Sequence, residues 1–453
     1  MSGRAFVAAT ALVLVAIPAP AHAAYSNDPN NWTSTQLAGQ LVMAGVPMSS
    51  LSTARTWVAN GIGGIVLLGT PPSNLGAQLA SVRAAGPVVP FVASDEEGGQ
   101  VQRLESVIYA LPSAETMGAT RTTSQVQAIA YDYGRRMRAL GVDLDLAPVA
   151  DLKIDGYYME RSDRAFATSP STVGAFTTAW LRGMRSARVL TSAKHWPGHG
   201  QATDTHAGGA TTPPLSTMQS RDMVPFDTVM ANGVPSVMVG HLKVPGLTES
   251  GVPASLSPNA MRYLRRRLGG ARLILTDSLS MAAITNMGLS PADAAVRALR
   301  AGADMALVTS DPLPVMSRIR AAIDAGTYPR ASAIASVRRV LAAKRVVNAP
   351  GVPSSIRPTS GSQTMPVTGT MSAVVTDRVP GVDRALFYVR TKGASTWNVT
   401  NGFTTSVAAG SRAYYRVEAG RLRPATTYEF ALRACNAAGL CATTGVGWFR
   451  TAA

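Results

Sequence analysis

The densest group of potentially reactive side chains lies in the segment from Lys194 to His206, KHWPGHGQATDTH. It holds His195, His199 and His206, three of the five histidines of the chain, together with Asp204. A carboxylate beside an imidazole fixes its tautomer and stabilises its charged form, which makes the pair a general acid/base suited to neutral pH. The proline and glycines between the histidines are typical of a shaped loop. The segment therefore predicts an Asp-x-His acid/base pair on a loop.

A metal site is the main alternative interpretation of the same histidines. The spacing of His195 and His199 matches the i, i+4 pair of helical zinc sites, and Asp204 and His206 would complete a set of four ligands. A Pro-Gly pair lies between the first two histidines and would break a helix, so we do not expect them on one helix face. Loop histidines with satisfied hydrogen bonds and no chemical role are a third interpretation.

Polar side chains also stand where apolar runs of the chain end. They are Asp95, Asp151, the pair Lys194 and His195, His241 and Asp277. In a barrel of alternating strands and helices, the active site lies at the carboxyl ends of the strands. One Asp after a strand is often only the N-cap of the next helix, so each residue alone decides little. Together, these positions predict a pocket lined with polar groups.

Eight apolar runs predict the strands that position these residues. The runs cover residues 41–45, 63–68, 89–94, 143–148, 190–194, 236–241, 272–276 and 304–308. Helix-length segments rich in Ala, Arg and Leu follow them, for example 124–140 and 291–301. Continuous apolar strands that alternate with helices predict a parallel sheet covered by helices. Eight repeats of this unit predict an α/β fold, a closed (β/α)8 TIM-type barrel over residues 24–348, rather than an open sheet.

A second, smaller unit follows the barrel. Residues 349–366 lose all periodicity and are rich in Pro, Ser, Gly and Thr, which predicts a linker. Residues 367–453 carry short alternating runs separated by turn residues, a pattern typical of a small all-β sandwich. The two cysteines of the chain, Cys435 and Cys441, fall in an expected β-hairpin, where an exported protein can form a local disulfide. Two unrelated buried thiols are the alternative.

The amino-terminal residues decide the expected compartment. Arg4 precedes the apolar run 5–17, and the small-residue pattern AHA follows at 21–23. This pattern predicts a cleavable secretory signal over residues 1–23, because the run is shorter than the roughly 20 residues of a membrane-spanning helix. No cysteine follows the run for lipid attachment. We therefore expect a secreted, extracellular protein without a membrane span.

The net charge of +16 does not by itself predict a nucleic-acid partner. Arg and Lys are spread along the chain, and the longest basic run is Arg265–Arg267. Dispersed positive charge favours weak attraction to an anionic cell envelope or to its fragments.

Several segments, in order, resemble the motifs of the β-N-acetylglucosaminidase branch of glycoside hydrolase family 3. The histidine segment resembles KH-(F/W)-PGHG-x3-D-(S/T)-H, and residues 95–103, DEEGGQVQR, resemble D-E-E-G-G-(R/Q)-V-x-R. Residues 146–151, LAPVAD, resemble the A-P-V-x-D segment of the family, and residues 253–257, PASLS, also match. Residues 275–281, LTDSLSM, resemble the segment that carries the nucleophile. Asp145 stands where the family has Asn. The resemblance covers about residues 35–345.

The resemblance implies a role for each residue of the site. Asp277 would be the nucleophile, and His206 the acid/base supported by Asp204. The hydroxyl groups of the sugar would be held by Asp95, Arg103, Arg164, Lys194 and His195. Neither a metal nor a cofactor is implied.

One of these matches departs from the family pattern. The family has R-S-F or R-S-Y, whereas Ala165 follows Arg164 in this chain. Arg161 is followed by Ser and competes for the same role. Arg164 is preferred because Phe166 stands two places beyond it.

As an activity, the resemblance implies a secreted retaining β-N-acetylglucosaminidase. It would release terminal β-linked GlcNAc from peptidoglycan fragments or chitooligosaccharides through a covalent glycosyl-Asp intermediate. Its partner would be a GlcNAc-containing glycan. A GlcNAc phosphorylase using the same site, a metal-dependent hydrolase and a non-catalytic carbohydrate-binding protein stay open as alternatives.

The carboxyl-terminal unit carries a second resemblance. The stretch LRPATTYEF at 422–430 resembles the tyrosine-corner region of fibronectin type III domains, and ALRACNAAG at 431–439 resembles their strand F and the turn after it. The resemblance leaves three roles open for this module: it contacts the cell envelope or a polysaccharide, it spaces the barrel from a surface, or it does neither.

Overall fold

The computed structural model describes residues 25–348 without a gap, together with shorter stretches of the remaining chain. These stretches are 354–357, 362–365, 370–374, 382–396, 398–400, 412–416, 422–436, 441–444 and 446–451. The expected signal segment 1–23 lies outside the described residues. In the part of the chain that the structure describes, no helix combines the length and the apolar character needed to cross a membrane.

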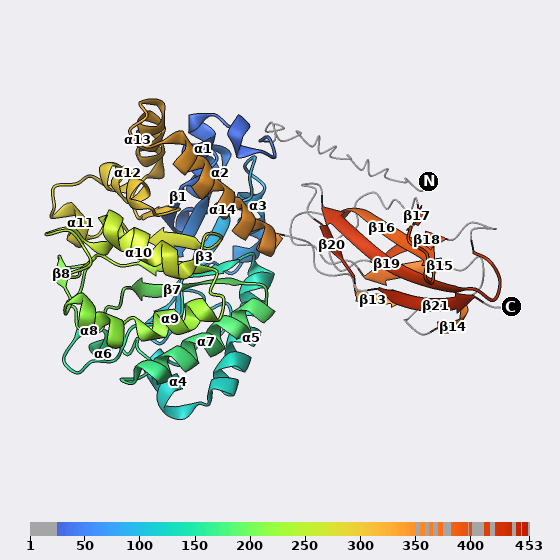
Figure 1. The fold of residues 1–453 in the computed structure, drawn as a ribbon, viewed down its shortest axis with the longest axis horizontal. Coiled ribbons are helices and arrows are strands. Elements are labelled where there is room, and N and C mark those ends of the chain that lie inside the picture. Colours follow the sequence, from blue (N-terminus) through green and yellow to red (C-terminus); the bar gives the residue numbers. More distant parts are fainter. Residues whose placement is uncertain are drawn as a thin grey trace, which may run out of the picture.

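Eight parallel strands form a nearly closed barrel, of which β1, β3 and β7 are labelled in Figure 1. The order of the strands around the barrel is β11-β9-β7-β6-β3-β2-β1-β12. They are β1 (Val42–Pro47), β2 (Gly64–Leu68), β3 (Phe91–Ser94), β6 (Leu144–Asp145), β7 (Leu190–Trp196), β9 (Ser236–Val239), β11 (Leu273–Thr276) and β12 (Ala306–Val308). The predicted barrel and its eight strands are confirmed. β6 is shorter than the predicted run 143–148, because Pro148 has no N–H to donate to a neighbouring strand.

Backbone hydrogen bonds beside β11 and β12 bring the two ends of the sheet together. The Asp304 N–H donates to the Ile274 carbonyl at 2.8 Å, and the Thr276 N–H donates to the Met305 carbonyl at 3.1 Å. β12 is therefore a neighbour of both β1 and β11, which places the segments after these three strands at one side of the barrel mouth.

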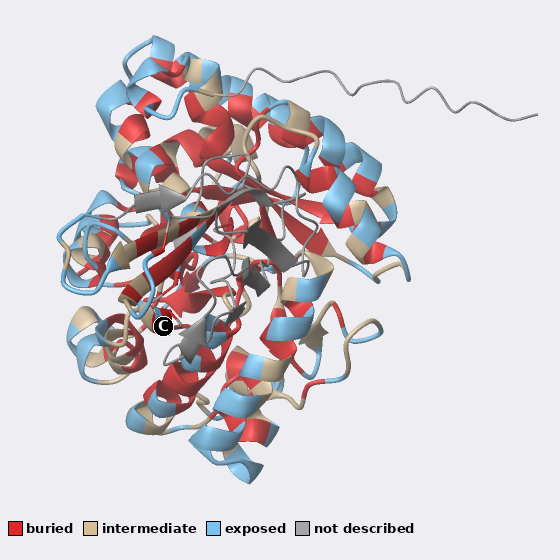
Figure 2. Ribbon diagram, turned by 90° about the vertical axis from the view of Figure 1, so that its right-hand side faces the viewer, coloured by how far each residue is buried: buried red, intermediate tan, exposed pale blue. Residues whose placement is uncertain are grey.

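Helices cover the outside of the barrel, and their buried residues face the strands (Figure 2). The longer helices are α2 (Leu51–Ala59), α3 (Leu75–Arg83), α5 (Thr123–Leu140), α7 (Pro170–Ser186), α9 (Val224–Ala231), α10 (Pro258–Leu268), α12 (Pro291–Ala301), α13 (Pro312–Asp324) and α14 (Arg330–Asn348). The predicted helices at 124–140 and 291–301 are confirmed as α5 and α12. Thr122 and Gln125 form a capping box before α5, and Gly141 ends it with a φ of 98°, a conformation that favours glycine.

α14 closes the barrel at the end where the strands begin. Val340 and Val347 of this helix belong to the same buried cluster as inward-facing strand residues such as Phe91. Lys344 is buried beside them and donates to Gln40 Oε1 at 2.7 Å. Burial lowers the pKa of Lys344 to about 7. The carboxyl-terminal half of α14 therefore packs on the core inside the barrel.

The carboxyl-terminal strands form two further sheets. One has the order β13-β15-β18, and the other has the order β14-β21-β19-β16-β17, with β20 paired to β19. Their bounds are β13 (Ser354–Arg357), β14 (Ser362–Met365), β15 (Thr370–Val374), β16 (Val382–Thr391), β17 (Asn398–Thr400), β18 (Arg412–Arg416), β19 (Thr427–Asn436), β20 (Cys441–Thr443) and β21 (Gly447–Thr451). Except for the parallel pair β14–β21, neighbouring strands are antiparallel, and a small β unit after the barrel is confirmed.

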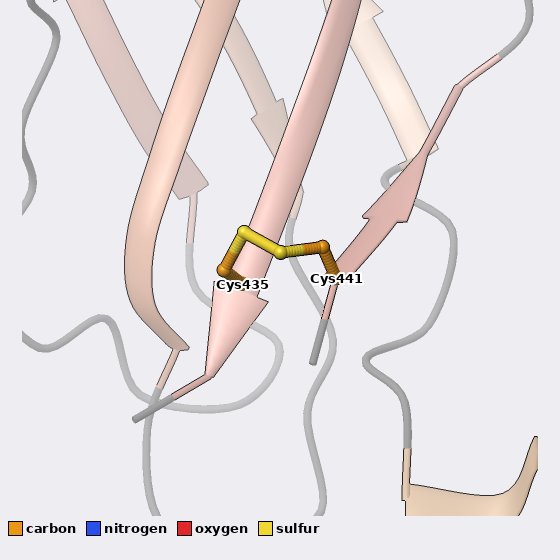
Figure 3. Close-up of a disulfide and its surroundings, with 2 residues drawn as sticks. All are labelled: Cys435 and Cys441. Atoms are coloured by element: carbon orange, nitrogen blue, oxygen red, sulfur yellow. A yellow bond between two sulfur atoms is a disulfide. The ribbon is translucent and has the colours of Figure 1, made fainter. Parts of the chain in front are cut away.

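Two side-chain contacts stabilise this unit. A disulfide joins Cys435 of β19 to Cys441 of β20 (Figure 3). The Tyr428 hydroxyl accepts the Arg423 N–H at 2.8 Å. A tyrosine that bonds backbone a few residues upstream is the arrangement of a tyrosine corner.

Two short strands lie inside the segment 349–366 that the sequence predicts as a linker. β13 pairs with β15, and β14 pairs with β21. The sequence prediction missed both strands. Each is short, polar and at the edge of its sheet, so neither carries the apolar alternation by which a strand is recognised.

Candidate active site

Four side chains near the ends of β3 and β7 form an ionic cluster, which we define as Asp95, Glu97, Arg164 and Lys194. Lys194 Nζ lies 2.5 Å from Asp95 Oδ1 and 2.7 Å from Glu97 Oε1. Arg164 donates to both oxygens of Glu97, at 2.7 and 2.9 Å. Only 3% of the Lys194 side chain and 1% of the Glu97 side chain are exposed. The cluster is thus largely shielded from solvent.

The charges of the cluster hold one another ionised. Burial lowers the pKa of Lys194, but the carboxylates of Asp95 and Glu97 raise it more, to above its usual value. Burial raises the pKa of Glu97, but Arg164 and Lys194 lower it more, to well below its usual value. Lys194 and Glu97 therefore stay charged at neutral pH and provide fixed donors and acceptors for hydroxyl groups. The sequence analysis missed Glu97, although it stands two places after Asp95 in the quoted motif.

Asp151 holds the backbone of two histidines and the ring of one. Its carboxylate accepts the N–H of His195 at 3.2 Å and that of His199 at 2.7 Å, and it lies 2.7 Å from His195 Nδ1. This contact leaves His195 Nε2 facing Arg164, 3.4 Å from its guanidinium. Burial lowers the pKa of His199 to about 4, so its ring is neutral at physiological pH. Asp151 thus orients His195 toward the ionic cluster.

Asp277 follows β11 at the barrel mouth. Its N–H donates to the Val239 carbonyl of β9 at 3.0 Å, and its Oδ1 accepts the Ser278 N–H at 2.7 Å. Burial raises the pKa of Asp277, but His195, the hydrogen bond from the Ser278 N–H and the charge of Lys194 lower it more, so that it lies below its usual value. The carboxylate is therefore an anion at neutral pH, as a nucleophile must be.

His241 supports the segment that carries Asp277. Its side chain is fully buried, with Nδ1 2.7 Å from Ser255 Oγ and Nε2 2.8 Å from the Ser278 carbonyl oxygen. Because a carbonyl only accepts, Nε2 donates to Ser278 and the Ser255 hydroxyl donates to Nδ1. Burial lowers the pKa of His241, which favours the neutral ring. With both ring nitrogens occupied, His241 is a positioning residue.

His206 and Asp204 lie on the loop after β7, and their side chains are 63% and 36% exposed. Asp204 Oδ1 lies 2.8 Å from His206 Nδ1 and also accepts the His206 N–H at 2.9 Å. The Ala283 N–H donates to the Thr205 carbonyl at 3.2 Å, which ties the loop to the segment after Asp277. Because Asp204 occupies Nδ1, Nε2 is the nitrogen that can pass a proton to a substrate.

Comparisons with known proteins show the family to which this barrel belongs. Residues 35–343 match the family model of the glycosyl hydrolase family 3 N-terminal domain. The chain is 41% identical over 345 residues to β-hexosaminidase LpqI of Mycobacterium tuberculosis, and the alignment covers 73% of this chain and 88% of the relative. This chain belongs to glycosyl hydrolase family 3. It is a glycoside hydrolase.

Two solved family 3 structures are similar to this hydrolase over the same share of its chain. A family 3 glycosyl hydrolase of Mycobacterium smegmatis has 38% identity and a TM-score of 0.64, over 70% of this chain and 98% of the other. A family 3 β-N-acetylglucosaminidase of a Paenibacillus strain has 30% identity and a TM-score of 0.66, over 70% of this chain and 62% of the other.

The two candidate arginines of this family 3 barrel differ in burial. Arg164 is buried and joins the ionic cluster, whereas Arg161, at the end of α6 (Tyr158–Arg161), is exposed. The backbone N–H of Arg103 donates to Glu96 Oε1 at 3.3 Å. Its side-chain Nε is buried and has no hydrogen-bond partner among the described residues. An unpaired guanidinium N–H suits recognition of a substrate hydroxyl.

A buried carboxyl pair, Glu96 and Asp145, was missed by the sequence analysis, although Glu96 stands between two members of the hydrolase's ionic cluster in the chain. Glu96 accepts hydrogen bonds from the hydroxyls of Ser94 and Tyr133, at 2.5 and 2.6 Å. Its own N–H donates to Asp145 Oδ1 at 3.3 Å, and Asp145 also accepts the Trp180 indole N–H at 2.9 Å. Burial raises the pKa of Glu96 to about 7 and that of Asp145 well above its usual value. Both residues are fully buried, and the pair supports the residues on either side of Glu96.

The three histidines of the segment 194–206 are not arranged as one set of metal ligands. His195 Nδ1 is held by Asp151, and His206 Nδ1 by Asp204. The His199 ring packs at 5.8 Å from the His195 ring. Within the described ranges, no three His, Cys, Asp or Glu side chains are grouped so that they could hold a metal ion. This geometry does not favour the metal-ligand interpretation of the segment.

Proposed function

We propose that this family 3 hydrolase is a secreted, retaining β-N-acetylglucosaminidase that removes terminal β-linked GlcNAc from peptidoglycan fragments or chitooligosaccharides. It is supported most by one observation: Asp277 follows β11 at the barrel mouth, and a separate Asp204–His206 pair lies on a loop that is hydrogen-bonded to the segment after Asp277. Two relatives support the sugar: LpqI is named a β-hexosaminidase, and the Paenibacillus structure a β-N-acetylglucosaminidase.

The first step is attack of Asp277 on the anomeric carbon. The ionic cluster, with Arg103 and His195, holds the hydroxyl groups of the terminal sugar and so orients that carbon toward the carboxylate. As the glycosidic bond breaks, His206 Nε2–H gives its proton to the departing oxygen. Asp204 stabilises the imidazolium that carries this proton. The product of the step is a covalent glycosyl-Asp intermediate and a free leaving group.

The second step returns the site to its starting state. His206, now neutral, takes a proton from a water molecule as that water attacks the anomeric carbon. The bond to Asp277 breaks, the carboxylate regains its charge, and the sugar leaves with the configuration it had in the substrate. An imidazole suits both steps because its pKa lies near neutrality, so it can give a proton and take one back.

A product assay with aryl glycosides tests the proposal. Nitrophenyl β-GlcNAc should be hydrolysed with a kcat/KM at least about 100-fold above that for nitrophenyl β-glucoside, since a site that bonds the acetamido group rejects a sugar without it. Comparable kcat/KM values for the two sugars would contradict the assignment. The same assay in EDTA tests the metal-dependent alternative, which predicts loss of activity in the chelator.

A phosphorylase using the same residues is the second candidate. The observation that favours it is the acid/base itself, since a neutral imidazole does not repel a phosphate anion as a carboxylate would. Release of GlcNAc 1-phosphate in phosphate buffer would identify a phosphorylase, and release of free GlcNAc in the same buffer a hydrolase.

We further propose that the unit after the barrel is a fibronectin type III-like module that contacts cell-envelope polysaccharide. The bond from the Arg423 N–H to the Tyr428 hydroxyl supports the module type. The net charge of +16 supports attraction to an anionic envelope. Secretion is tested by the amino terminus of the exported protein, which should follow residue 23. A pull-down of the full chain with isolated cell wall tests the contact, and binding should weaken as salt is raised.

A further inference from the structure

A cavity of about 510 Å³ opens at the barrel mouth beside β1 and β12. It is bounded by the end of β1 from Gly45 onward, by the segment 309–311 after β12, and by the face of α2 that carries Thr53 and Thr56. Its volume lies in the range of ligand pockets, about 300–1,000 Å³. No residue of the ionic cluster and none of the acid/base pair lines it. The cavity is thus distinct from the groups that hold the terminal sugar.

Hydrogen bonds connect the cavity wall to the nucleophile segment. Thr309, which lines the cavity, lies with Oγ1 3.3 Å from Ser278 Oγ, and its N–H donates to Ser280 Oγ at 3.1 Å. Ser278 and Ser280 follow Asp277 directly in the chain. Thr309 of the cavity wall is therefore hydrogen-bonded to the chain segment that carries Asp277.

The topology places this cavity opposite the ionic cluster. β11, which carries Asp277, has β9 and then β7 on one side, and β12 and then β1 on the other. The ionic cluster extends from β3 and β7, so it approaches Asp277 from the β9 side. The cavity lies on the β12 side of Asp277. If the terminal sugar of a substrate lies against the ionic cluster, the sugar units beyond the scissile bond extend away from the cluster.

The chemistry of the lining suits a sugar. Hydroxyls of Ser and Thr dominate its polar groups, and the Trp57 indole forms part of its wall. The one charged lining residue is Asp311, whose Oδ1 already accepts the Leu313 N–H at 3.1 Å as the N-cap of α13. Hydroxyl side chains can both donate to and accept from a pyranose, and an aromatic ring supplies apolar contact area.

We propose that this cavity binds the leaving-group side of the substrate, as a subsite for the hydroxyl-rich pyranose units that follow the scissile bond. The inference rests on the proposed glycosidase function and extends it. The position of His206 is consistent with this subsite. Its loop is hydrogen-bonded to Ala283, in the segment after Asp277, and the departing oxygen must receive its proton near Asp277. The site thus holds the terminal sugar on one side of the nucleophile and the rest of the glycan on the other.

A pair of matched substitutions on α2 tests the subsite in the full-length protein. Thr53 is exposed and lines the cavity, so Thr53→Trp would fill it; Ser52 is exposed on the same helix but is not part of the lining. We expect Thr53→Trp to lower the kcat/KM for chitotriose relative to that for nitrophenyl β-GlcNAc by about tenfold, which corresponds to about 1.4 kcal/mol. Ser52→Trp should leave this ratio within about twofold of the wild-type ratio.

Further measurements separate the two hypotheses and the two glycan sources. An unchanged ratio in Thr53→Trp, with normal turnover of nitrophenyl β-GlcNAc, would overturn the subsite and leave the glycosidase function intact. Absence of turnover of any β-GlcNAc glycoside by the wild-type enzyme would instead overturn the proposed function. A GlcNAc–MurNAc disaccharide serves as the second probe: a loss equal to that for chitotriose supports recognition of the shared pyranose, and no loss for either glycan contradicts it.

Discussion

The ionic cluster and the acid/base loop, two regions of one site, are constructed in opposite ways. Lys194 and Glu97 are almost completely buried, and their partners approach from strands and segments far apart in the chain. His206 is 63% exposed, and its partner Asp204 is only two residues away. The ionic cluster, which we propose holds the sugar, is therefore fixed by the barrel, while the proposed acid/base pair is placed by a local loop.

The contrast shows where each part of the activity should be sensitive. Charges buried in a preorganised cluster are costly to unbalance, so substitutions there should affect folding and substrate binding together. An exposed hydrogen-bonded pair contributes little to folding, so substitutions in the loop should change the rate and leave stability almost unaltered.

The largest effect is expected at Asp277, where the two regions meet. Asp277→Ala removes the group that attacks the anomeric carbon, so kcat should fall by at least about 10⁴-fold for every glycoside, whatever its leaving group. Steady-state kinetics on nitrophenyl β-GlcNAc and chitotriose measures the loss. A variant that keeps activity on the nitrophenyl glycoside alone would show that Asp277 is not the nucleophile.

The loop should show a different pattern in His206→Ala. A sugar leaving group needs the proton that His206 supplies and a nitrophenolate does not, so formation of the glycosyl-enzyme should slow by about 10²–10⁴-fold for chitotriose and far less for nitrophenyl β-GlcNAc. The missing base should make the intermediate accumulate, which pre-steady-state kinetics would record as a burst of nitrophenol. Azide needs no base and should restore turnover with a β-glycosyl azide as product.

Two controls sharpen this result. Asp204→Asn keeps the imidazole but weakens its orientation and its charged form, so it should show the same pattern with a smaller loss. The thermal midpoints of both loop variants should match the wild type. Equal losses for good and poor leaving groups, without azide rescue, would exclude His206 as the acid/base.

In the ionic cluster, Glu97→Gln should affect stability as well as kinetics. The substitution keeps the volume of the side chain but leaves Lys194 and Arg164 with one negative charge fewer in a buried space. We expect the free energy of unfolding to fall by about 3 kcal/mol and KM to rise. Denaturant titration measures the first effect. A variant as stable as the wild type would mean that the cluster is less coupled to folding than its burial indicates.

The smallest effect is expected at the buried carboxyl pair Glu96 and Asp145, and it depends on pH. Because the folded-state pKa of Glu96 is about 7, above its usual value of 4.5, its protonated form stabilises the fold. This contribution is complete below about pH 4.5 and is lost as pH rises through about 7. Glu96→Gln should therefore reduce the fall in unfolding free energy between pH 4.5 and pH 8 by about 1–2 kcal/mol. Parallel slopes for variant and wild type in denaturant titrations would contradict the prediction.

The strands were accessible to sequence analysis because their pattern is local. A buried parallel strand is a continuous apolar run, and eight such runs alternated with helix-length segments. The helix at 291–301 was found with its full length, since Ser290 and Pro291 mark its start. β13 and β14 were missed for the opposite reason, because short polar edge strands are defined by their neighbours in the sheet and not by their own residues.

The sequence by itself determined the contact between Asp204 and His206, because the two residues are two positions apart and no distant segment is needed to bring them together. It also placed Asp277 at the end of a strand. Only the tertiary structure decided how the groups of the ionic cluster combine. Arg164 reaches Glu97 across 67 residues of chain, and Lys194 reaches Asp95 across 99. Such pairs exist only once the barrel closes, since the order of strands around the barrel, and not spacing along the chain, sets which charges are buried together.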